Sequence, residues 1–216
     1  MTTLIIGANG KIGKDLVAKC VAREIPVRAM VRDESQRAFF ESLGADVVLG
    51  DLEGDLNAAF EGCEQVVFSA GSGAATSPHK TLLVDLWGSI QAIRCAKKHH
   101  IKHFIMVSAL KANDPLRGPE RIKHYLVARN RADDYLSRSG LPYTLLRPGR
   151  LLDTPATGKY GSDFDWSDTK NEHCVISRQD VANLIIELLQ QPLPSGRVID
   201  MVNGTEALNH FLKLHA

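Results

Sequence analysis

Residues 2–20 read TTLIIGANGKIGKDLVAKC and combine a short apolar run, three glycines and a second set of apolar residues. Its apolar run, Leu4-Ile5-Ile6, is too short for anything but a buried strand. From Ile12 onward the apolar residues return at helical spacing. The sequence therefore predicts a strand, a tight turn and a helix in direct succession.

Three glycines, Gly7, Gly10 and Gly13, fall on the predicted turn. Glycine accepts a positive φ and has no Cβ, so the backbone can approach a ligand closely. The N-terminus of the following helix adds a partial positive charge, which favours an anion. Because the motif follows a strand and opens a helix, we expect it to hold the diphosphate of a dinucleotide, with a purely structural turn as the alternative.

Apolar strands alternate with helical patterns along almost the whole chain, which is typical of a parallel sheet with helices on both faces. Length and hydrophobic content suit one core. We predict an α/β fold, a Rossmann-type doubly wound parallel sheet, as a single domain over residues 1–216. The expected strands lie near Thr3–Ile6, Val27–Val31, Val47–Leu49, Val66–Ser69, Phe104–Ser108, Tyr143–Leu146 and Val198–Val202, and the expected helices cover Lys11–Arg23, Glu34–Leu43, His79–His99, Arg121–Ser139 and Arg178–Gln190.

The periodicity breaks down between Leu151 and Val175. A long irregular stretch in a compact domain is usually a functional loop or lid. We therefore expect a short C-terminal substrate cap over residues 151–175, with Phe164 and Trp166 on a mobile lid.

The formal net charge is +1, with Lys and Arg spread along the chain, so nothing favours nucleic acid or an anionic membrane as a partner. No apolar stretch approaches the roughly 20 residues that span a bilayer, and no charged-then-apolar leader opens the chain. We expect a cytoplasmic protein with a small-molecule partner, as a monomer or weak homo-oligomer. The spacings of the four cysteines and of His99, His100 and His103 predict no metal site.

Ligands of an open parallel sheet lie beyond the carboxyl ends of the strands. After the second expected strand come Arg32 and Asp33, with Arg28 within that strand as a second cation. A guanidinium there favours the 2′-phosphate of NADP over NAD, although Arg32 is also compatible with a solvated side chain and Asp33 with a helix cap. Asp51, after the third strand, suits either a hydrogen bond to adenine or a turn.

Ser108 closes the fifth expected strand, and Tyr125 lies on the next helix, four residues before Arg129. Positions four apart share one helical face, so the phenol and the guanidinium can point into one cleft. A cation beside the phenol assists proton transfer, and the two hydroxyl groups can polarise a carbonyl. A surface Tyr-Arg pair is the alternative.

Several motifs occur in the order seen in atypical short-chain dehydrogenase/reductases, over nearly the whole chain. They are Gly7-Ala8-Asn9-Gly10-Lys11-Ile12-Gly13, Asp51-Leu52, Ser69-Ala70-Gly71, Val84-Asp85-Leu86-Trp87-Gly88, Val107-Ser108-Ala109, Tyr125-x-x-x-Arg129 and Arg147-Pro148-Gly149. The chain most resembles the small NmrA-like or flavin-reductase-like branch, which includes proteins of the NAD-dependent epimerase/dehydratase type.

The resemblance implies an NAD(P)-binding Rossmann fold in which Ser108, Tyr125 and Arg129 are catalytic candidates. It also implies cofactor contacts from Gly7, Asn9, Gly10, Lys11, Ile12, Gly13, Arg32, Asp51, Leu52, Ser69, Ala70, Gly71, Tyr125, Arg129, Pro148 and Gly149.

Two departures from the family pattern affect the expected activity. Arg129 stands where the family has lysine, and it keeps the charge but not the compact geometry. The chain after Pro148 is short, which disfavours a sugar-nucleotide epimerase/dehydratase. We therefore expect an NAD(P)H-dependent oxidoreductase for a small carbonyl or similar acceptor, with a non-catalytic NAD(P)-binding redox sensor as the alternative.

Overall fold

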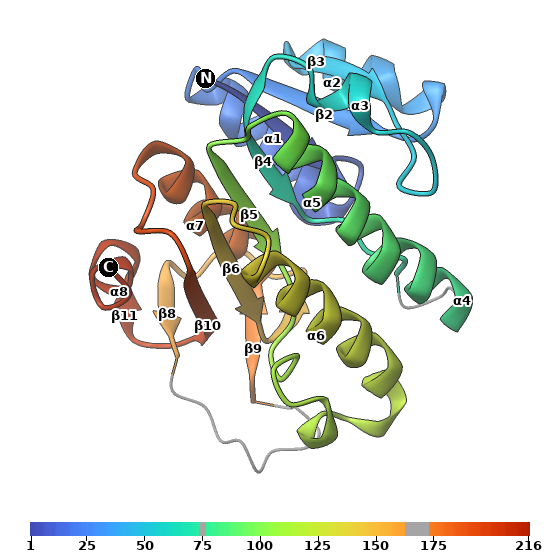
Figure 1. The fold of residues 1–216 in the computed structure, drawn as a ribbon. Coiled ribbons are helices and arrows are strands. Elements are labelled where there is room, and N and C mark those ends of the chain that lie inside the picture. Colours follow the sequence, from blue (N-terminus) through green and yellow to red (C-terminus); the bar gives the residue numbers. More distant parts are fainter. Residues whose placement is uncertain (74–76, 163–172) are drawn as a thin grey trace.

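The computed structural model describes residues 1–73, 77–162 and 173–216. Within these ranges the main sheet has nine strands in the order β11-β8-β10-β6-β5-β4-β1-β2-β3 (Figure 1). Neighbouring strands from β3 to β10 pair in parallel, and β8 joins antiparallel to both β10 and β11. The strand order turns back at β1, between β2 and β4, which is the doubly wound topology that the sequence predicts.

The strands of the main sheet are β1 (Thr2–Ile6), β2 (Val27–Val31), β3 (Asp46–Leu49), β4 (Cys63–Phe68), β5 (His103–Val107), β6 (Tyr143–Pro148), β8 (Lys159–Gly161), β10 (Arg197–Asn203) and β11 (Glu206–Ala207). Strands β7 (Arg150–Leu152) and β9 (Val175–Ser177) form a small parallel sheet of their own. The helices are α1 (Lys11–Ala22), α2 (Arg37–Leu43), α3 (Asn57–Phe60), α4 (Pro78–Lys80), α5 (Ser89–Lys98), α6 (Lys123–Ser137), α7 (Arg178–Gln190) and α8 (Leu208–Lys213), with a π-helical segment at Thr81–Gly88.

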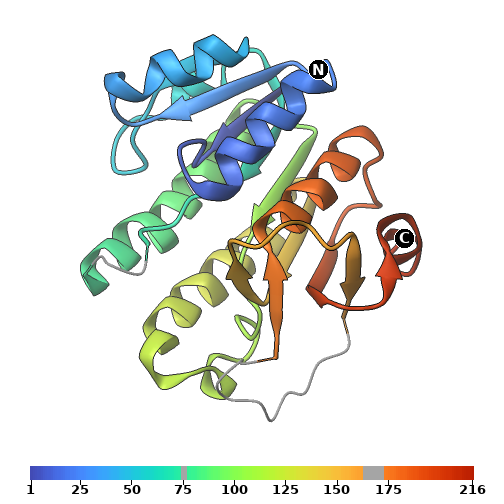
Figure 2. The ribbon, with the colours of Figure 1, turned by 180° about the vertical axis from the view of Figure 1, so that it is seen from behind.

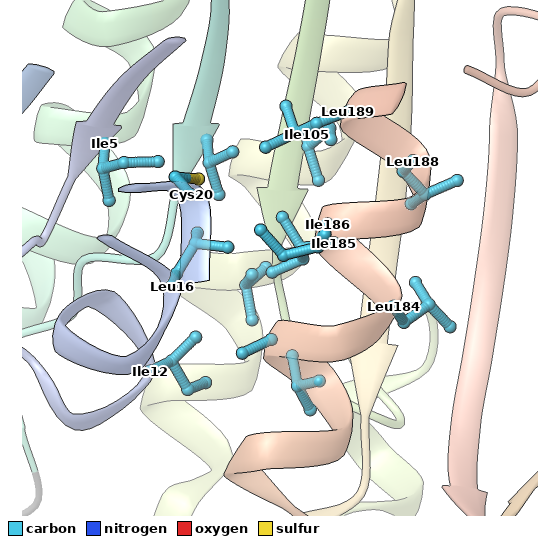
Figure 3. Packing of buried hydrophobic residues seen from close by; sticks show 14 of the residues in the cluster. Ile5, Ile12, Leu16, Cys20, Ile105, Leu184, Ile185, Ile186, Leu188 and Leu189 are labelled. Atoms are coloured by element: carbon cyan, nitrogen blue, oxygen red, sulfur yellow. The ribbon is translucent and has the colours of Figure 1, made fainter. Parts of the chain in front are cut away.

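Helices cover both faces of the main sheet. Side chains alternate along β1, so Ile5 joins the core on one face while Leu4 and Ile6 join the core on the other. Helices α5 and α6 cover the second face, and α1 and α7 cover the first, as the two opposite views show (Figures 1 and 2). Figure 3 shows the first core from close by, where α1 and α7 meet over the sheet, with labelled side chains Ile5, Ile12, Leu16, Cys20, Ile105, Leu184, Ile185, Ile186, Leu188 and Leu189.

The seven predicted strands and five predicted helical regions are present, with ends shifted by a few residues. The expected helix at His79–His99 is divided into α4, the π-helical segment and α5. The stretch expected to be irregular from Leu151 onward contains β7 and β8, so that expectation is wrong for these residues. Both strands are too short to show a period, and their pairing depends on partners distant in sequence. Phe164 and Trp166 of the expected lid lie outside the described residues.

Candidate active site

Two adjoining cavities lie at the carboxyl ends of the parallel strands. They share Ser69, Ala70 and Gly71, which directly follow β4. The first cavity, of about 320 Å³, is lined by Gly7, Asn9, Gly10, Met30, Val31, Arg32, Gln36, Gly50, Asp51, Leu52, the three shared residues and Val84. The second, of about 430 Å³, is lined by Ile12, the three shared residues, Ser72, Gly73, Pro78, Thr81, Asp85, Val107, Ser108, Arg121, Ile122, His124, Tyr125, Arg129 and Leu151.

The glycine-rich turn after β1 forms one wall of the first cavity. Gly7 has φ +89°, and a Cβ there would lie 2.6 Å from the backbone nitrogen of Ala70. A Cβ on Gly13 would lie 2.2 Å from the carbonyl oxygen of Gly7. Gly10 differs, because it has ordinary dihedral angles and a Cβ there would meet only this same oxygen, at 3.2 Å. Gly7 and Gly13 are thus needed for close packing of the turn, whereas Gly10 faces the first cavity at the N-terminus of α1.

The residues after β2 take separate roles. Arg32 is exposed on the lining of the first cavity, and its backbone N–H donates to Oε1 of Gln36 at 3.3 Å. Asp33 caps the next turn, because its carboxylate accepts the Ser35 N–H at 2.9 Å; the Ser35 hydroxyl and then this N–H hold the Asp33 pKa below its usual value. Arg28 does not line the cavity, since its Nε donates to Asp46 at 2.5 Å. Of the two candidate cations, only Arg32 faces this space.

Asp51 forms a turn at the lining of the first cavity. Its Oδ1 accepts the Glu53 N–H at 3.0 Å, which stabilises a turn, and its carbonyl accepts the Gly54 N–H at 2.9 Å. Both Asp51 and Leu52 also line the first cavity. A turn residue at this place is therefore within reach of a ligand in that cavity.

A buried guanidinium organises the second cavity. The side chain of Arg129 is 3% exposed, and its Nε donates to Oη of Tyr125 at 3.2 Å. Its Nη2 donates to the carbonyl oxygen of Ala70 at 2.6 Å and to Oδ1 of Asp85 at 3.0 Å. The Tyr125 and Arg129 pair expected on one face of a helix is present on α6, where Arg129 is buried and Tyr125 is half-buried on the lining of the second cavity.

Asp85 is the counterion of Arg129 and comes from the π-helical segment. It is fully buried, and its Oδ2 accepts both the N–H and the hydroxyl of Ser72, at 3.1 and 2.6 Å. Burial opposes the charge on Arg129, but the Tyr125 phenol and the Asp85 carboxylate outweigh it and raise the Arg129 pKa above its ordinary value. The guanidinium is therefore firmly charged beside the phenol.

Two buried polar atoms of this cavity have no hydrogen-bond partner among the described residues, Oγ of Ser108 and Nη1 of Arg129. Ser108 is held by its backbone, whose N–H donates to the carbonyl of Leu146 at 2.7 Å. Buried polar atoms are nearly always partnered, so such atoms on a cavity wall suit a polar ligand. Nε of Arg147 donates to Asp133 at 3.0 Å; burial raises the Asp133 pKa, and Arg147 and the nearby Ser108 hydroxyl oppose that rise.

Four predicted cofactor residues do not line either cavity: Lys11, Gly13, Pro148 and Gly149. Lys11 is exposed and forms an ion pair with Asp153, and a Cβ on Gly149 would lie 2.3 Å from the carbonyl oxygen of Cys174. The other predicted site residues all lie on a cavity lining. The roles expected for Lys11, Pro148 and Gly149 stay predictions.

The sequence alone gave no role to several residues of the second cavity, above all Asp85, Arg121 and His124. Asp85 does carry a signal, because it is an acid within the apolar run Leu82–Trp87, where a charge needs a partner. Arg121 and His124 carry none, since their position depends on how the segment before α6 folds back over the cavity.

The histidines near the start of β5 take structural positions. His103 is buried, its Nε2 lies 2.9 Å from Oγ1 of Thr144, and burial lowers its pKa to about 4. Across the described ranges, no group of three or more His, Cys, Asp or Glu side chains is arranged to hold a metal ion. In the same ranges no helix has the length and apolar character needed to cross a membrane.

Comparisons with known proteins agree with this geometry. Residues 7–192 match the model of a family described as NAD(P)H-binding. The chain is 42% identical to the uncharacterized sugar epimerase YhfK of Bacillus subtilis, over 99% of both chains. Among solved structures it is similar to a candidate NAD-dependent epimerase/dehydratase from Bacillus halodurans, at 40% identity, 99% coverage of both chains and a TM-score of 0.91.

A second solved structure is the oxidoreductase YlbE of Lactococcus lactis, which shares 26% identity with this chain at a TM-score of 0.84. The match covers 100% of this chain and 99% of that one. These similarities extend over both cavities and the elements that carry them. The chain belongs to the NAD(P)H-binding family of Rossmann-fold proteins.

Proposed function

We propose that this protein is an NADPH-dependent reductase of a small carbonyl compound or similar acceptor. The observation that carries the proposal is the convergence of Ser108, Tyr125 and Arg129 on the second cavity, which adjoins the first along Ser69, Ala70 and Gly71. A dinucleotide has an adenosine end and a nicotinamide end linked by a diphosphate, and two adjoining cavities can hold one end each. The glycine-rich turn lies where the diphosphate is expected.

The residues present fit an NADP-type cofactor. Gly7 and Gly10 place no side chain on the lining of the first cavity, and Arg32 lines that cavity as a cation suited to a 2′-phosphate. Arg129 has a buried nitrogen, Nη1, free of partners in the described ranges. Bound NADPH supplies a hydride to the acceptor. In this proposal the acceptor lies in the second cavity, beside the nicotinamide end of the cofactor.

Tyr125 is the proton donor in this proposal. Its Oη accepts a hydrogen bond from Nε of Arg129, so the phenolic proton remains free for the acceptor oxygen. After the proton leaves, the adjacent guanidinium stabilises the phenolate. Ser108 offers a second hydroxyl to the same oxygen, and Arg129 keeps Tyr125 in position while Asp85 and Ala70 fix the guanidinium.

The test of this function is NADPH oxidation against a panel of aldehydes, ketones, quinones and flavins. Enzymatic turnover of at least one acceptor, lost in a Tyr125 variant, supports the reductase. If no acceptor is reduced while NADPH still binds, the reductase proposal is wrong.

NADP rather than NAD is expected because Arg32 lines the first cavity without an acidic partner in the described part of the chain. A charge-assisted contact with the 2′-phosphate is worth ~1.5–3 kcal/mol. Arg32→Ala is therefore expected to weaken NADPH binding roughly ten-fold or more and to leave NADH binding nearly unchanged. Calorimetric titration with both cofactors checks this, with Arg28→Ala as a control that removes a cation of β2 engaged elsewhere. Equal losses for both cofactors would rule out this role for Arg32.

Substitutions at Gly10 and Gly13 are expected to have different effects, on NADPH binding and on stability respectively. Gly10→Val is expected to leave a folded protein but to weaken NADPH binding about ten-fold or more, because the side chain fills the space beside the N-terminus of α1. Gly13→Ala is expected to lower the melting temperature by about 4 °C or more, since its Cβ overlaps backbone atoms. Calorimetric binding and thermal melts separate the two, and parental affinity in Gly10→Val would mean that the diphosphate binds elsewhere.

A non-catalytic NADPH sensor is the second candidate. It is favoured by one observation, that Nε and Nη2 of Arg129 are already engaged within the protein, by Tyr125, Ala70 and Asp85. A sensor binds NADPH without reducing any acceptor, so the acceptor panel distinguishes the two functions.

A further inference from the structure

The outer wall of the second cavity comes from the segment that leads into α6. Arg121 and Ile122 of this segment line the cavity, and so do His124 and Tyr125 in the first turn of α6. The same cavity is also lined by the apolar residues Ile12, Val107, Leu151 and Pro78. A ligand beside Tyr125 therefore shares this space with apolar side chains and with Arg121 and His124.

The positive charge of this wall is not neutralised by the acids near it. Asp85, which supplies a carboxylate to the lining, forms an ion pair with Arg129 and accepts a hydrogen bond from Ser72. Along the segment itself, Glu120 forms an ion pair with Lys123.

Asp114, the other acid of the segment, forms an ion pair with Arg117 at 3.4 Å between Nε and Oδ2. Arg121 and His124 are exposed, and neither has an acidic partner in the described ranges of the chain. The guanidinium of Arg121 and the imidazole of His124 are thus available to a ligand in the second cavity.

We propose that the second cavity takes an acceptor that bears an anionic group, a carboxylate on an apolar body, and that Arg121 with His124 holds this group while Tyr125 faces the reactive end. This inference rests on the proposed reductase function and specifies its substrate class. The planar guanidinium fits a carboxylate through two parallel hydrogen bonds, a geometry that a lysine cannot reproduce. If Arg121 contacts only water, its substitution leaves the affinity for a carboxylate ligand unchanged.

The test uses two probes that differ in one charge, 4-carboxybenzaldehyde and its neutral methyl ester, methyl 4-formylbenzoate. Binding of each to the NADP⁺-saturated protein is measured by ligand-observed NMR. The acid is expected to bind at least about ten-fold more tightly than the ester, as expected for a charge-assisted contact. Arg121→Gln is expected to remove most of this preference.

Arg197→Gln is the matched control. Arg197 is exposed at the start of β10, away from the carboxyl ends of the strands, and its loss changes the net charge by the same amount. The ratio of acid to ester affinity is expected to stay at the parental value in this variant. If the acid does not bind, if acid and ester bind equally, or if both variants lose the preference alike, the proposal is overturned.

Turnover of the same two probes with NADPH separates this inference from the function on which it rests. Arg121-dependent binding of the acid without NADPH oxidation against any acceptor leaves the anion site in place and contradicts the reductase. Equal kcat/KM for the acid and the ester supports the reductase and contradicts the anion site.

Discussion

Tyr125→Phe is expected to lower turnover about 10²-fold or more, the usual scale for the loss of a general acid, with little change in NADPH affinity. The substitution removes only Oη and keeps the ring beside Arg129. The buried contacts of Arg129 with Ala70 and Asp85 do not involve the phenol, so the fold of the site remains. Single-turnover kinetics with NADPH and the best acceptor of the panel measure the effect.

Tyr135→Phe is the matched control for this variant. Tyr135 lies on the same helix, α6, and its hydroxyl accepts a hydrogen bond from Arg94 at 3.1 Å, outside the lining of both cavities. It is expected to retain parental turnover. Parental turnover in Tyr125→Phe as well would show that Tyr125 is not the proton donor.

Arg129→Met is expected to destabilise the protein by about 3–5 kcal/mol, the usual result of breaking a buried ion pair. The side chains of Arg129 and Asp85 are 3% and 0% exposed, so removing the guanidinium leaves a buried carboxylate whose only remaining donor in the described ranges is Ser72. Activity and NADPH affinity are expected to fall as well, because the cation beside Tyr125 is lost. Urea unfolding, calorimetry and NADPH oxidation measure the three effects.

Arg129→Lys separates charge from geometry and remains informative if Arg129→Met does not fold. Lysine keeps the charge beside Asp85 and restores the residue typical of the resembled family, so this variant is expected to keep or raise activity. Arg94→Met is the control for stability, because Arg94 is an exposed residue that contacts Gln91 and Tyr135. Equal urea midpoints for Arg129→Met and Arg94→Met would contradict a structural role of the buried pair.

The fold was largely predictable because its strands are strong local signals. In β1, Leu4, Ile5 and Ile6 are all buried, since helices cover both faces of a parallel sheet, and a continuous apolar run reports this arrangement. The short strands β7, β8 and β11 were not predictable, because they exist through pairing with distant partners rather than through a period of their own. The π-helical segment around Asp85 interrupts a pattern that reads as one helix.

The site was predictable where a residue's position follows from the fold. Arg32 and Ser108 follow β2 and β5 directly, and Gly10 lies in the turn after β1, so their place at the carboxyl edge of the sheet could be inferred. The partnership of Asp85 with Arg129 spans 44 residues and joins two helical elements, so nothing local indicates it. Likewise, the exposure of Arg121 on the second cavity depends on how the segment before α6 folds.

We propose that NADPH lies across both cavities with its reactive ring beside Tyr125. A crystal structure of the protein with NADPH bound tests this most directly. In that structure the adenosine 2′-phosphate is expected near Arg32 and the diphosphate at Gly10. The nicotinamide ring is expected in the second cavity, facing Ser108 and Tyr125. A nicotinamide ring outside the second cavity, with Tyr125 out of reach of it, would contradict the proposed role of Tyr125 as proton donor.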